Sequence, residues 1–415
     1  MNKKTLVSTF LVRFILAINT FGVFILSSRY LGADGRGTIS LFVANVTVVQ
    51  LFSEIIFGSG YIYFIHQYNK KDIITYGFIL STLAGLLIPG ILYITHLHPE
   101  KLVFDLIINS ILFAWVNWIG LHLRAHKHFK FYNTFYLFLS VFQISVIWFM
   151  MHDLASVENY ILGLQIHLSI SFIIGLFFLF ALPKNKIEST KNPIHWFALI
   201  KKSIVSQYSN WLFFLNTRIS FYIIYSYLNN TEQLGIYSAA SVLTEAIWII
   251  PIALATPLYP IISAETDKNK IIHMTNEYAY SSFWLSLFAC VILLLTPEMV
   301  FEYILGKDFK GLHTFITILA SGSLILSYAK IYWNYFQGMG LFNINSKATI
   351  ISLAIPLTLF IPFISITGVY GVALMSCTSY ILYSIMLMYY YHKATNTPWK
   401  ALLLPPFRLL PKPIF

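Results

Sequence analysis

Long apolar segments alternate with short polar connections along almost the entire chain. A bilayer core about 30 Å thick needs about 20 apolar residues in a helix that crosses it. Continuous apolar runs of this length indicate helices, because the strands of a membrane β-barrel are short and alternate with polar residues. The pattern predicts twelve membrane-spanning helices, at residues 6–28, 38–65, 73–95, 102–122, 131–151, 158–182, 203–228, 235–262, 278–296, 311–336, 348–366 and 369–391.

Basic residues are distributed unevenly between the two sets of loops that these helices define. With the N-terminus inside, 19 of the 27 Lys and Arg residues fall in cytoplasmic segments and five fall in outer loops, Arg36 among them. Cytoplasmic loops are enriched in Lys and Arg, so we expect a multi-pass protein of the cell (inner) membrane with cytoplasmic N- and C-termini. Arg13 and the length of the first run favour a retained helix over a cleaved signal peptide.

The longest polar stretch follows the sixth predicted helix and divides the chain into two halves. We expect an N-terminal six-helix lobe at 1–182, a cytoplasmic linker at 183–202, a C-terminal six-helix lobe at 203–392 and a cytoplasmic tail at 393–415. Six is an even number, so both lobes begin on the same side of the membrane. The lobes are therefore predicted to be related by a pseudo-two-fold axis along the membrane normal, which is the parallel type of transporter repeat.

The composition supports the membrane assignment and excludes several other classes of protein. The chain is 58% hydrophobic and only 10% charged, whereas soluble domains are about 25% charged. Its net charge of +11 is attributed to basic loops at an anionic leaflet and not to nucleic-acid binding. Cys290 and Cys377 lie in apolar runs and form no metal motif. Without nucleotide-binding or hydrolase motifs, we expect no cofactor, no metal site and no catalytic residue.

Histidines gather at two predicted loop ends. His96 and His98 form one group, and His122, His126 and His128 form the other. Both groups lie beside basic residues and lack the carboxylates or cysteines that a metal site would use. Solvation at the membrane interface is therefore the favoured interpretation of both groups.

Five charged residues lie well inside predicted helices, namely Arg13, Glu54, Arg218, Glu245 and Lys330. A charge there costs about 2.5–3.5 kcal/mol on insertion scales, so it normally faces a cavity or a partner. One interpretation is a cationic cavity in which Arg13, Arg218 and Lys330 bind a diphosphate, because a guanidinium fork grips phosphate oxygens in pairs.

Alternatives remain open for each of these charges. Arg13 with Glu54, and Arg218 with Glu245, are candidates for structural ion pairs between neighbouring helices. Lys330 can also extend its ammonium toward an interface. Desolvation favours the protonated form of a carboxyl group, so Glu54 and Glu245 are also candidates for coupling transport to H⁺ or Na⁺.

Several short motifs resemble one family of membrane proteins. They are Ser28–Gly37 (SRYLGADGRG), Gly58-Ser59-Gly60, Gly306–Phe309 (GKDF), Gln337–Gly340 (QGMG), Ile361-Pro362 and Gly368–Ala373 (GVYGVA). Together they resemble the polysaccharide-exporter branch of the MOP flippase superfamily, which comprises lipid-linked oligosaccharide (O-antigen or capsule unit) flippases. The likeness runs over nearly the whole chain.

The resemblance implies a MATE-like bundle of two six-helix lobes that moves undecaprenyl-diphosphate-linked oligosaccharides to the outer leaflet by alternating access. It also implies cationic cavity residues, and Arg13 is the candidate match to an arginine in helix one of a related branch. The expected partners are membrane lipid, the lipid-linked oligosaccharide, H⁺ or Na⁺, and polymerase or glycosyltransferase proteins. A drug exporter of the same superfamily is the alternative, and a glycan polymerase or acyltransferase is a third, disfavoured by the absence of a large outer loop.

Overall fold

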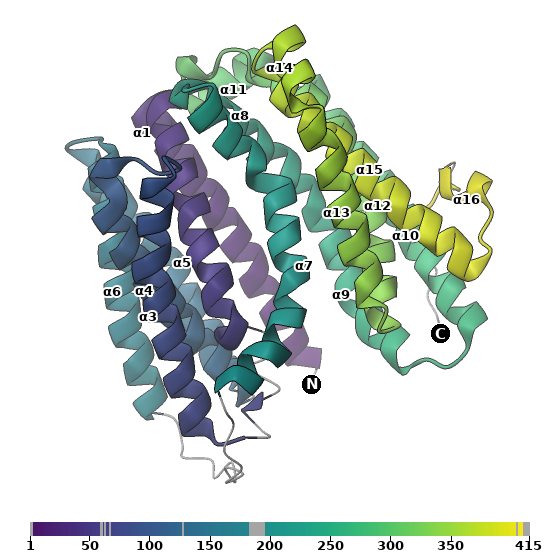
Figure 1. Ribbon diagram of the computed structural model, residues 1–415, viewed down its shortest axis with the longest axis horizontal. Helices are drawn as coiled ribbons and strands as arrows, with labels where there is room; N and C mark the ends of the chain where they lie inside the picture. Colours follow the sequence, from purple (N-terminus) through teal and green to yellow (C-terminus); the bar gives the residue numbers. More distant parts are fainter. Residues whose placement is uncertain are drawn as a thin grey trace. The chain divides into compact units, whose positions relative to one another are not determined.

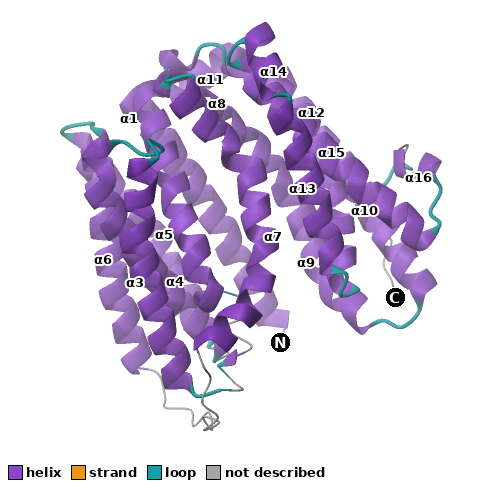
Figure 2. Ribbon diagram, in the orientation of Figure 1, coloured by secondary structure: helices purple, strands orange, loops and turns teal. Residues whose placement is uncertain are grey.

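The computed structural model describes residues 3–58, 61, 64, 65, 68–126, 128–181, 196–403 and 406–409. Within these ranges, a few helical side chains, among them that of Arg13, are not described. The described residues are almost entirely helical and contain no strand, as Figure 2 shows. The predicted all-α membrane fold is therefore confirmed.

The chain forms two compact units, residues 1–211 with 304–306, and residues 212–303 with 307–415. The helices of the first unit are α1 (Lys3–Phe57), α3 (Lys70–Ile94), η1 (Glu100–Leu102), α4 (Val103–Ala125), α5 (Phe129–His152), α6 (Val157–Ala181) and most of α7 (Trp196–Tyr222). The predicted linker 183–202 lies largely outside the described residues, and its last seven residues form the first turns of α7.

The second unit contains the end of α7 and, except for the last two residues of α11 (Glu298–Leu305), the helices that follow. These are η2 (Ile223–Tyr227), α8 (Thr231–Glu245), η3 (Ala246–Trp248), α9 (Ile249–Ala264), α10 (Lys268–Leu295), α11 (Glu298–Leu305), η4 (Lys307–Phe309), α12 (Leu312–Gly338), α13 (Phe342–Thr358), α14 (Phe360–Thr367), α15 (Tyr370–Thr395) and α16 (Trp399–Leu403). Of the predicted tail 393–415, residues 393–395 complete α15.

Nine helices in the described part of the chain are long and apolar enough to cross a membrane, or ten if the bent pair α13–α14 is one span. The pair bends by 48° just beyond Pro356, a residue that cannot donate a helical hydrogen bond. The remaining two predicted runs fall on the second half of α1 and on α7. Polar residues interrupt α7, and it is not among the helices apolar enough to cross a membrane by this criterion.

Gly32 divides α1 into the first two predicted spans, which Figure 1 shows doubling back on each other in purple. Its backbone angles of φ 65° and ψ −171° belong to a region that only glycine adopts without strain. The guanidinium carbon of Arg36 lies 4.9 Å from the ring centroid of Phe24. Twelve residues span about 18 Å in a straight helix, so this contact requires the reversal.

Each unit has its own aromatic core. In the first unit the ring of Phe57 packs edge-on against Phe78, with centroids 5.2 Å apart, and a Cβ on Gly77 would lie 1.9 Å from the Phe57 ring. In the second unit the rings of Tyr332 on α12 and Tyr391 on α15 are 4.4 Å apart. These cores hold the helices that carry the deep charges.

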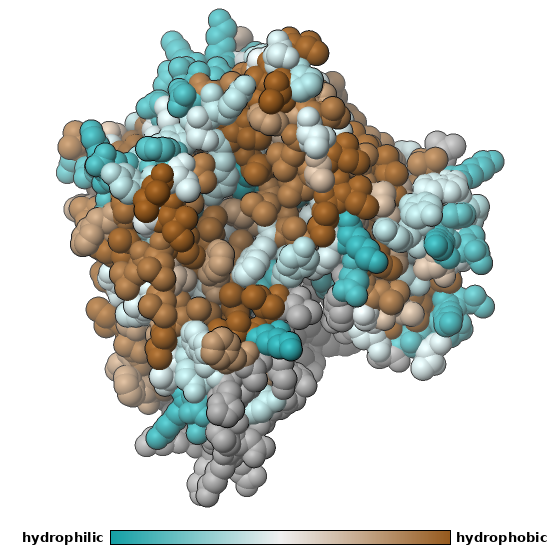
Figure 3. Space-filling view, viewed as in Figure 1, coloured by the Kyte–Doolittle hydropathy of each residue, from teal (hydrophilic) through white to brown (hydrophobic). Residues whose placement is uncertain are grey.

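Apolar side chains cover much of the surface between the helix ends. On α3, Leu86, Leu87, Ile91 and Ile94 are all exposed. Figure 3 shows hydrophobic residues along the helices, with hydrophilic residues collected near their ends. Such exposure is costly in water and is expected in contact with lipid, so the chain is a multi-pass membrane protein.

Candidate functional site

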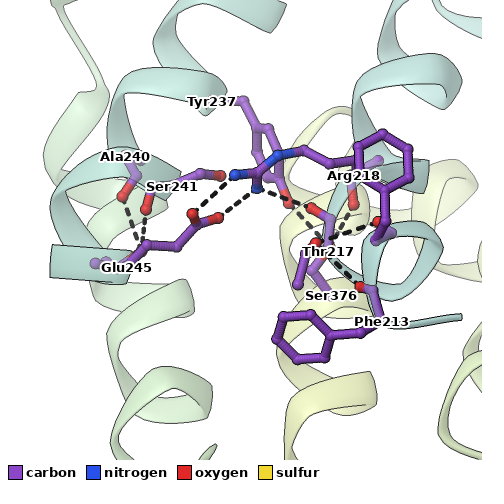
Figure 4. A network of polar contacts seen from close by, with 11 residues as sticks. Phe213, Thr217, Arg218, Tyr237, Ala240, Ser241, Glu245 and Ser376 are labelled. Atoms are coloured by element: carbon purple, nitrogen blue, oxygen red, sulfur yellow. Dashed lines mark hydrogen bonds and ion pairs between the residues drawn. The ribbon is translucent and has the colours of Figure 1, made fainter. Parts of the chain in front are cut away.

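Arg218 and Glu245 form a two-pronged ion pair inside the second unit (Figure 4). Arg218 lies on α7, and both of its terminal nitrogens donate to the Glu245 carboxylate on α8, with Nη2 2.8 Å from Oε2. The two side chains are only 25% and 20% exposed. The arrangement is the ion pair that the sequence raised as the alternative to substrate binding by Arg218, and the carboxylate occupies the fork that would otherwise grip phosphate.

Hydroxyl groups from three helices surround this pair. The Tyr237 hydroxyl on α8 lies 2.9 Å from Ser376 Oγ on α15, and Ser376 Oγ also contacts Ser220 Oγ on α7. Figure 4 shows Tyr237 and Ser376 beside the Arg218 side chain. Serine and tyrosine hydroxyls that bond to one another satisfy buried polar groups, so this network fixes α7, α8 and α15 around the ion pair.

Lys330 on α12 supplies a second positive charge near Glu245. Its Nζ lies 4.1 Å from the ring centroid of Trp248 and 5.4 Å from that of Phe213, which is favourable cation–π geometry. Among the described residues, no side chain accepts a hydrogen bond from this ammonium or pairs with it within ion-pair distance. Glu245 is near enough to attract Lys330 electrostatically but is bonded to Arg218.

Trp248 has an unsatisfied donor beside this lysine. Its indole Nε1 is buried and makes no hydrogen bond within the described part of the chain, which is uncommon for a buried N–H group. The Lys330 ammonium and the Trp248 indole therefore offer donors to a ligand with acceptor oxygens. Arg218, Glu245 and Lys330 together carry a net charge of +1, so the cluster favours an anion.

Glu54 lies in the first unit and is held by amide groups. Its carboxylate accepts from Gln50 Nε2 at 3.1 Å and from Gln207 Nε2 at 3.3 Å. Gln207 also donates to the Glu54 backbone carbonyl at 2.7 Å, which ties α7 to the second half of α1. The Arg13 side chain lies outside the described residues, so its pairing with Glu54 stays a prediction. Position 13 is as far before Gly32 as position 51 is after it. Position 51 is less than one helical turn from Glu54, so Arg13 and Glu54 are at similar depths.

Arg36 is a buried cation that the sequence did not single out. We expected it in an outer loop, but α1 continues through it, and its guanidinium donates to Ser27 Oγ at 2.9 Å. Its Nε is buried without a hydrogen-bond partner among the described residues. The glycines on both sides of Arg36 were the available signal, because they allow helices to approach closely.

The histidines occupy two different environments. Asn45 Nδ2 donates to His98 Nδ1 at 2.9 Å, and burial lowers the pKa of His98. The second group, His122, His126 and His128, is stacked at the end of α4. The part of the chain that the structure describes contains no group of three or more His, Cys, Asp or Glu residues that could hold a metal ion.

Comparisons with known proteins define the class of fold. No family model matches the chain. One curated relative, "Lsg locus putative protein 1" of Haemophilus influenzae, is 25% identical over 346 residues, which cover 79% of this chain and 82% of that protein.

Three solved structures show the same architecture. An inward-facing multidrug resistance MATE-family transporter of the MOP superfamily has a TM-score of 0.74 at 14% identity, covering 94% of this chain and 95% of the other. The lipid II flippase MurJ has a TM-score of 0.71 at 14% identity, with 97% and 89% covered. A point mutant of the Vibrio cholerae MATE transporter VcmN scores 0.59 at 11% identity, with 95% and 98% covered. The chain has the fold of MOP-superfamily transporters and flippases.

Proposed function

We propose that the chain is a flippase that moves an undecaprenyl-diphosphate-linked oligosaccharide, an O-antigen or capsule repeat unit, from the inner to the outer leaflet. The protein would act in the cell (inner) membrane by alternating access, with cytoplasmic termini and without enzymatic chemistry. Glycosyltransferases would supply its cargo, and a polymerase would use it on the outer side.

The observation that carries this proposal is the ammonium of Lys330. It is a cation in a membrane-spanning helix with no anionic partner of its own among the described residues. A charge in that position is costly unless a ligand or cavity compensates it. A diphosphate supplies several anionic acceptor oxygens, and hydrogen bonds between charged groups are the stronger kind.

Arg13, Arg218 and Lys330 remain the proposed contacts to the diphosphate, and we place Lys330 first among them. Arg218 already shares its fork with Glu245, so its main contribution is to orient that carboxylate and the surrounding helices. Of the two candidates for H⁺ or Na⁺ coupling, Glu54 is favoured. Its carboxylate is bonded to neutral amides, whereas Glu245 is neutralised by Arg218.

Two further observations agree with a lipid-linked anionic cargo. The motifs that resemble polysaccharide exporters extend over nearly the whole chain, and the lipid II flippase MurJ shares the fold. The fold alone accommodates a MATE-type drug exporter equally well, because function depends on the site and not on the fold. The net charge of +1 on the Lys330 cluster disfavours organic cations as cargo.

Deletion of the gene in its host is expected to accumulate undecaprenyl-diphosphate-linked oligosaccharide in the inner leaflet and to remove the corresponding surface glycan. The host supplies its own cargo, so the sugar need not be known in advance. Extracted lipids would be quantified by mass spectrometry, with the deletion complemented by the wild-type chain as the control. An unchanged lipid pool combined with increased sensitivity to cationic drugs would instead identify an exporter of the MATE type.

A further inference from the structure

A row of three histidines and one lysine lies where α4 ends and α3 begins, in the first unit. The rings of His122 and His126 stack with centroids 4.1 Å apart and planes 23° apart. The ring of His128 continues the row at 6.4 Å from His126, with planes 9° apart. Lys70, the first residue of α3, places its Nζ 3.2 Å from His126 Nε2. Nothing in the proposed transport cycle uses these four residues.

The contacts of His126 assign its protons. Its Nδ1 lies 3.0 Å from the His122 backbone carbonyl oxygen, which is an acceptor only, so Nδ1 carries a hydrogen. Its Nε2 faces the Lys70 ammonium, which is a donor only, so Nε2 carries the lone pair. His126 is therefore neutral in this arrangement and orients the lysine.

His122 is held from the other side by a chain of aromatic donors. The Trp118 indole N–H donates to the Tyr61 hydroxyl at 3.2 Å, and that hydroxyl lies 2.8 Å from His122 Nδ1. The phenol thus has its own proton available for the imidazole. Because His122 is fixed in this way, the ring that stacks on it, His126, is fixed as well.

The positive charge of this cluster is not balanced within it. Lys70 has three donor hydrogens, and among the described residues only His126 accepts one of them. Around His122 the ionisable neighbours that act on it electrostatically are Lys70, His126 and His128, and none of them is acidic. An anion with several acceptor oxygens would satisfy the remaining donors of Lys70.

We propose that Lys70, oriented by His126 and flanked by His128, binds the phosphate of an anionic phospholipid headgroup. Lys70 provides the charge and two N–H donors that no described residue accepts, while His122 and Tyr61 hold the row in place. On the topology expected from the loop charges, this end of α4 meets the cytoplasmic leaflet, where anionic lipids attract clustered basic residues. Inorganic phosphate presents the same chemistry, so the lipid headgroup and the soluble ion have to be distinguished by experiment.

The test measures binding of three probes to the purified full-length chain by native mass spectrometry and thermal unfolding. The probes are phosphatidylglycerol, phosphatidylcholine and inorganic phosphate. Lys70→Gln is expected to weaken phosphatidylglycerol binding by about tenfold, the usual effect of losing one hydrogen bond between charged groups. The matched control is Lys71→Gln, which removes the same charge from the exposed neighbouring residue and is expected to bind like wild type.

Further variants separate positioning from folding. Lys70→Arg keeps the charge and is expected to retain the preference for phosphatidylglycerol, while His126→Gln is expected to weaken it with an unchanged unfolding temperature. If inorganic phosphate binds through Lys70 and competes with phosphatidylglycerol, the phosphate site is supported. Its ligand would then be the soluble ion and not the lipid headgroup. Equal losses in the Lys70→Gln and Lys71→Gln variants, or equal binding of phosphatidylglycerol and phosphatidylcholine by wild type, would overturn the proposal.

Discussion

Replacing Lys330 with Gln is expected to lower surface glycan export by about tenfold to a hundredfold without lowering the stability of the protein. The ammonium has no anionic partner of its own among the described residues, so its loss leaves no carboxylate newly unpaired. What disappears is a hydrogen bond between charged groups at the cargo phosphate, which contributes about 1.5–3 kcal/mol. Export would be measured as surface glycan in a complemented deletion strain, alongside thermal unfolding of the purified variant.

The matched control is Lys347→Gln on α13, which removes a lysine charge from an exposed position in the same unit. That variant is expected to export normally. Lys330→Arg keeps the charge over Trp248 and is expected to recover part of the activity. Normal export by Lys330→Gln would remove Lys330 from the transport site. Equal losses of export in Lys330→Gln and Lys347→Gln would show that only the net charge of the protein matters.

Removing one partner of the Arg218–Glu245 pair is expected to destabilise the protein by about 3–5 kcal/mol, because the remaining charge stays buried without its counter-ion. Either Arg218→Met or Glu245→Leu should therefore unfold at a markedly lower temperature than wild type. The double replacement removes both charges together, and well-packed apolar residues can substitute for a buried pair at little cost. Thermal unfolding of the four proteins in the same detergent measures the coupling directly.

The double variant also distinguishes a structural role of the Arg218–Glu245 pair from a role in transport. Its net charge equals that of wild type, and Lys330 is untouched, so we expect it to export more glycan than Lys330→Gln does. If the double variant loses as much stability as the two single variants combined, the two residues do not act as a pair. A stable double variant with no export would instead show that Arg218 or Glu245 takes part in transport itself.

The hydropathy pattern was sufficient to predict the helices. Within the described chain, the twelve predicted runs fall largely on helical residues, because lipid leaves a spanning segment few alternatives to a helix. The reversal within α1 was predictable too, since it falls at a glycine in the polar gap between two apolar runs. Among the described helices, α7 is marginal by hydropathy because Gln207, Asn210 and Arg218 interrupt it.

The partners of the deep charges could be predicted only in part. A pair between Arg218 and Glu245 was one of the interpretations that the sequence left open, since neighbouring helices carry the two residues, and the structure joins them. Lys330 and Trp248 are 82 positions apart, and no periodicity links a lysine on α12 to an indole in η3. The burial of Arg36 was missed for a related reason. Counting Lys and Arg residues in the predicted loops treats every charge near a turn as exposed to solvent. In the structure, tertiary packing encloses this guanidinium against Phe24.

The most direct test of the proposed function is whether the purified chain binds a prenyl diphosphate through Lys330. Native mass spectrometry would compare undecaprenyl diphosphate with undecaprenol, on wild type and on Lys330→Gln. We expect wild type to retain the diphosphate and not the alcohol, and the glutamine variant to bind the diphosphate at least about tenfold more weakly. Equal retention of the two lipids by wild type, or undiminished diphosphate binding by the variant, would contradict the proposed function.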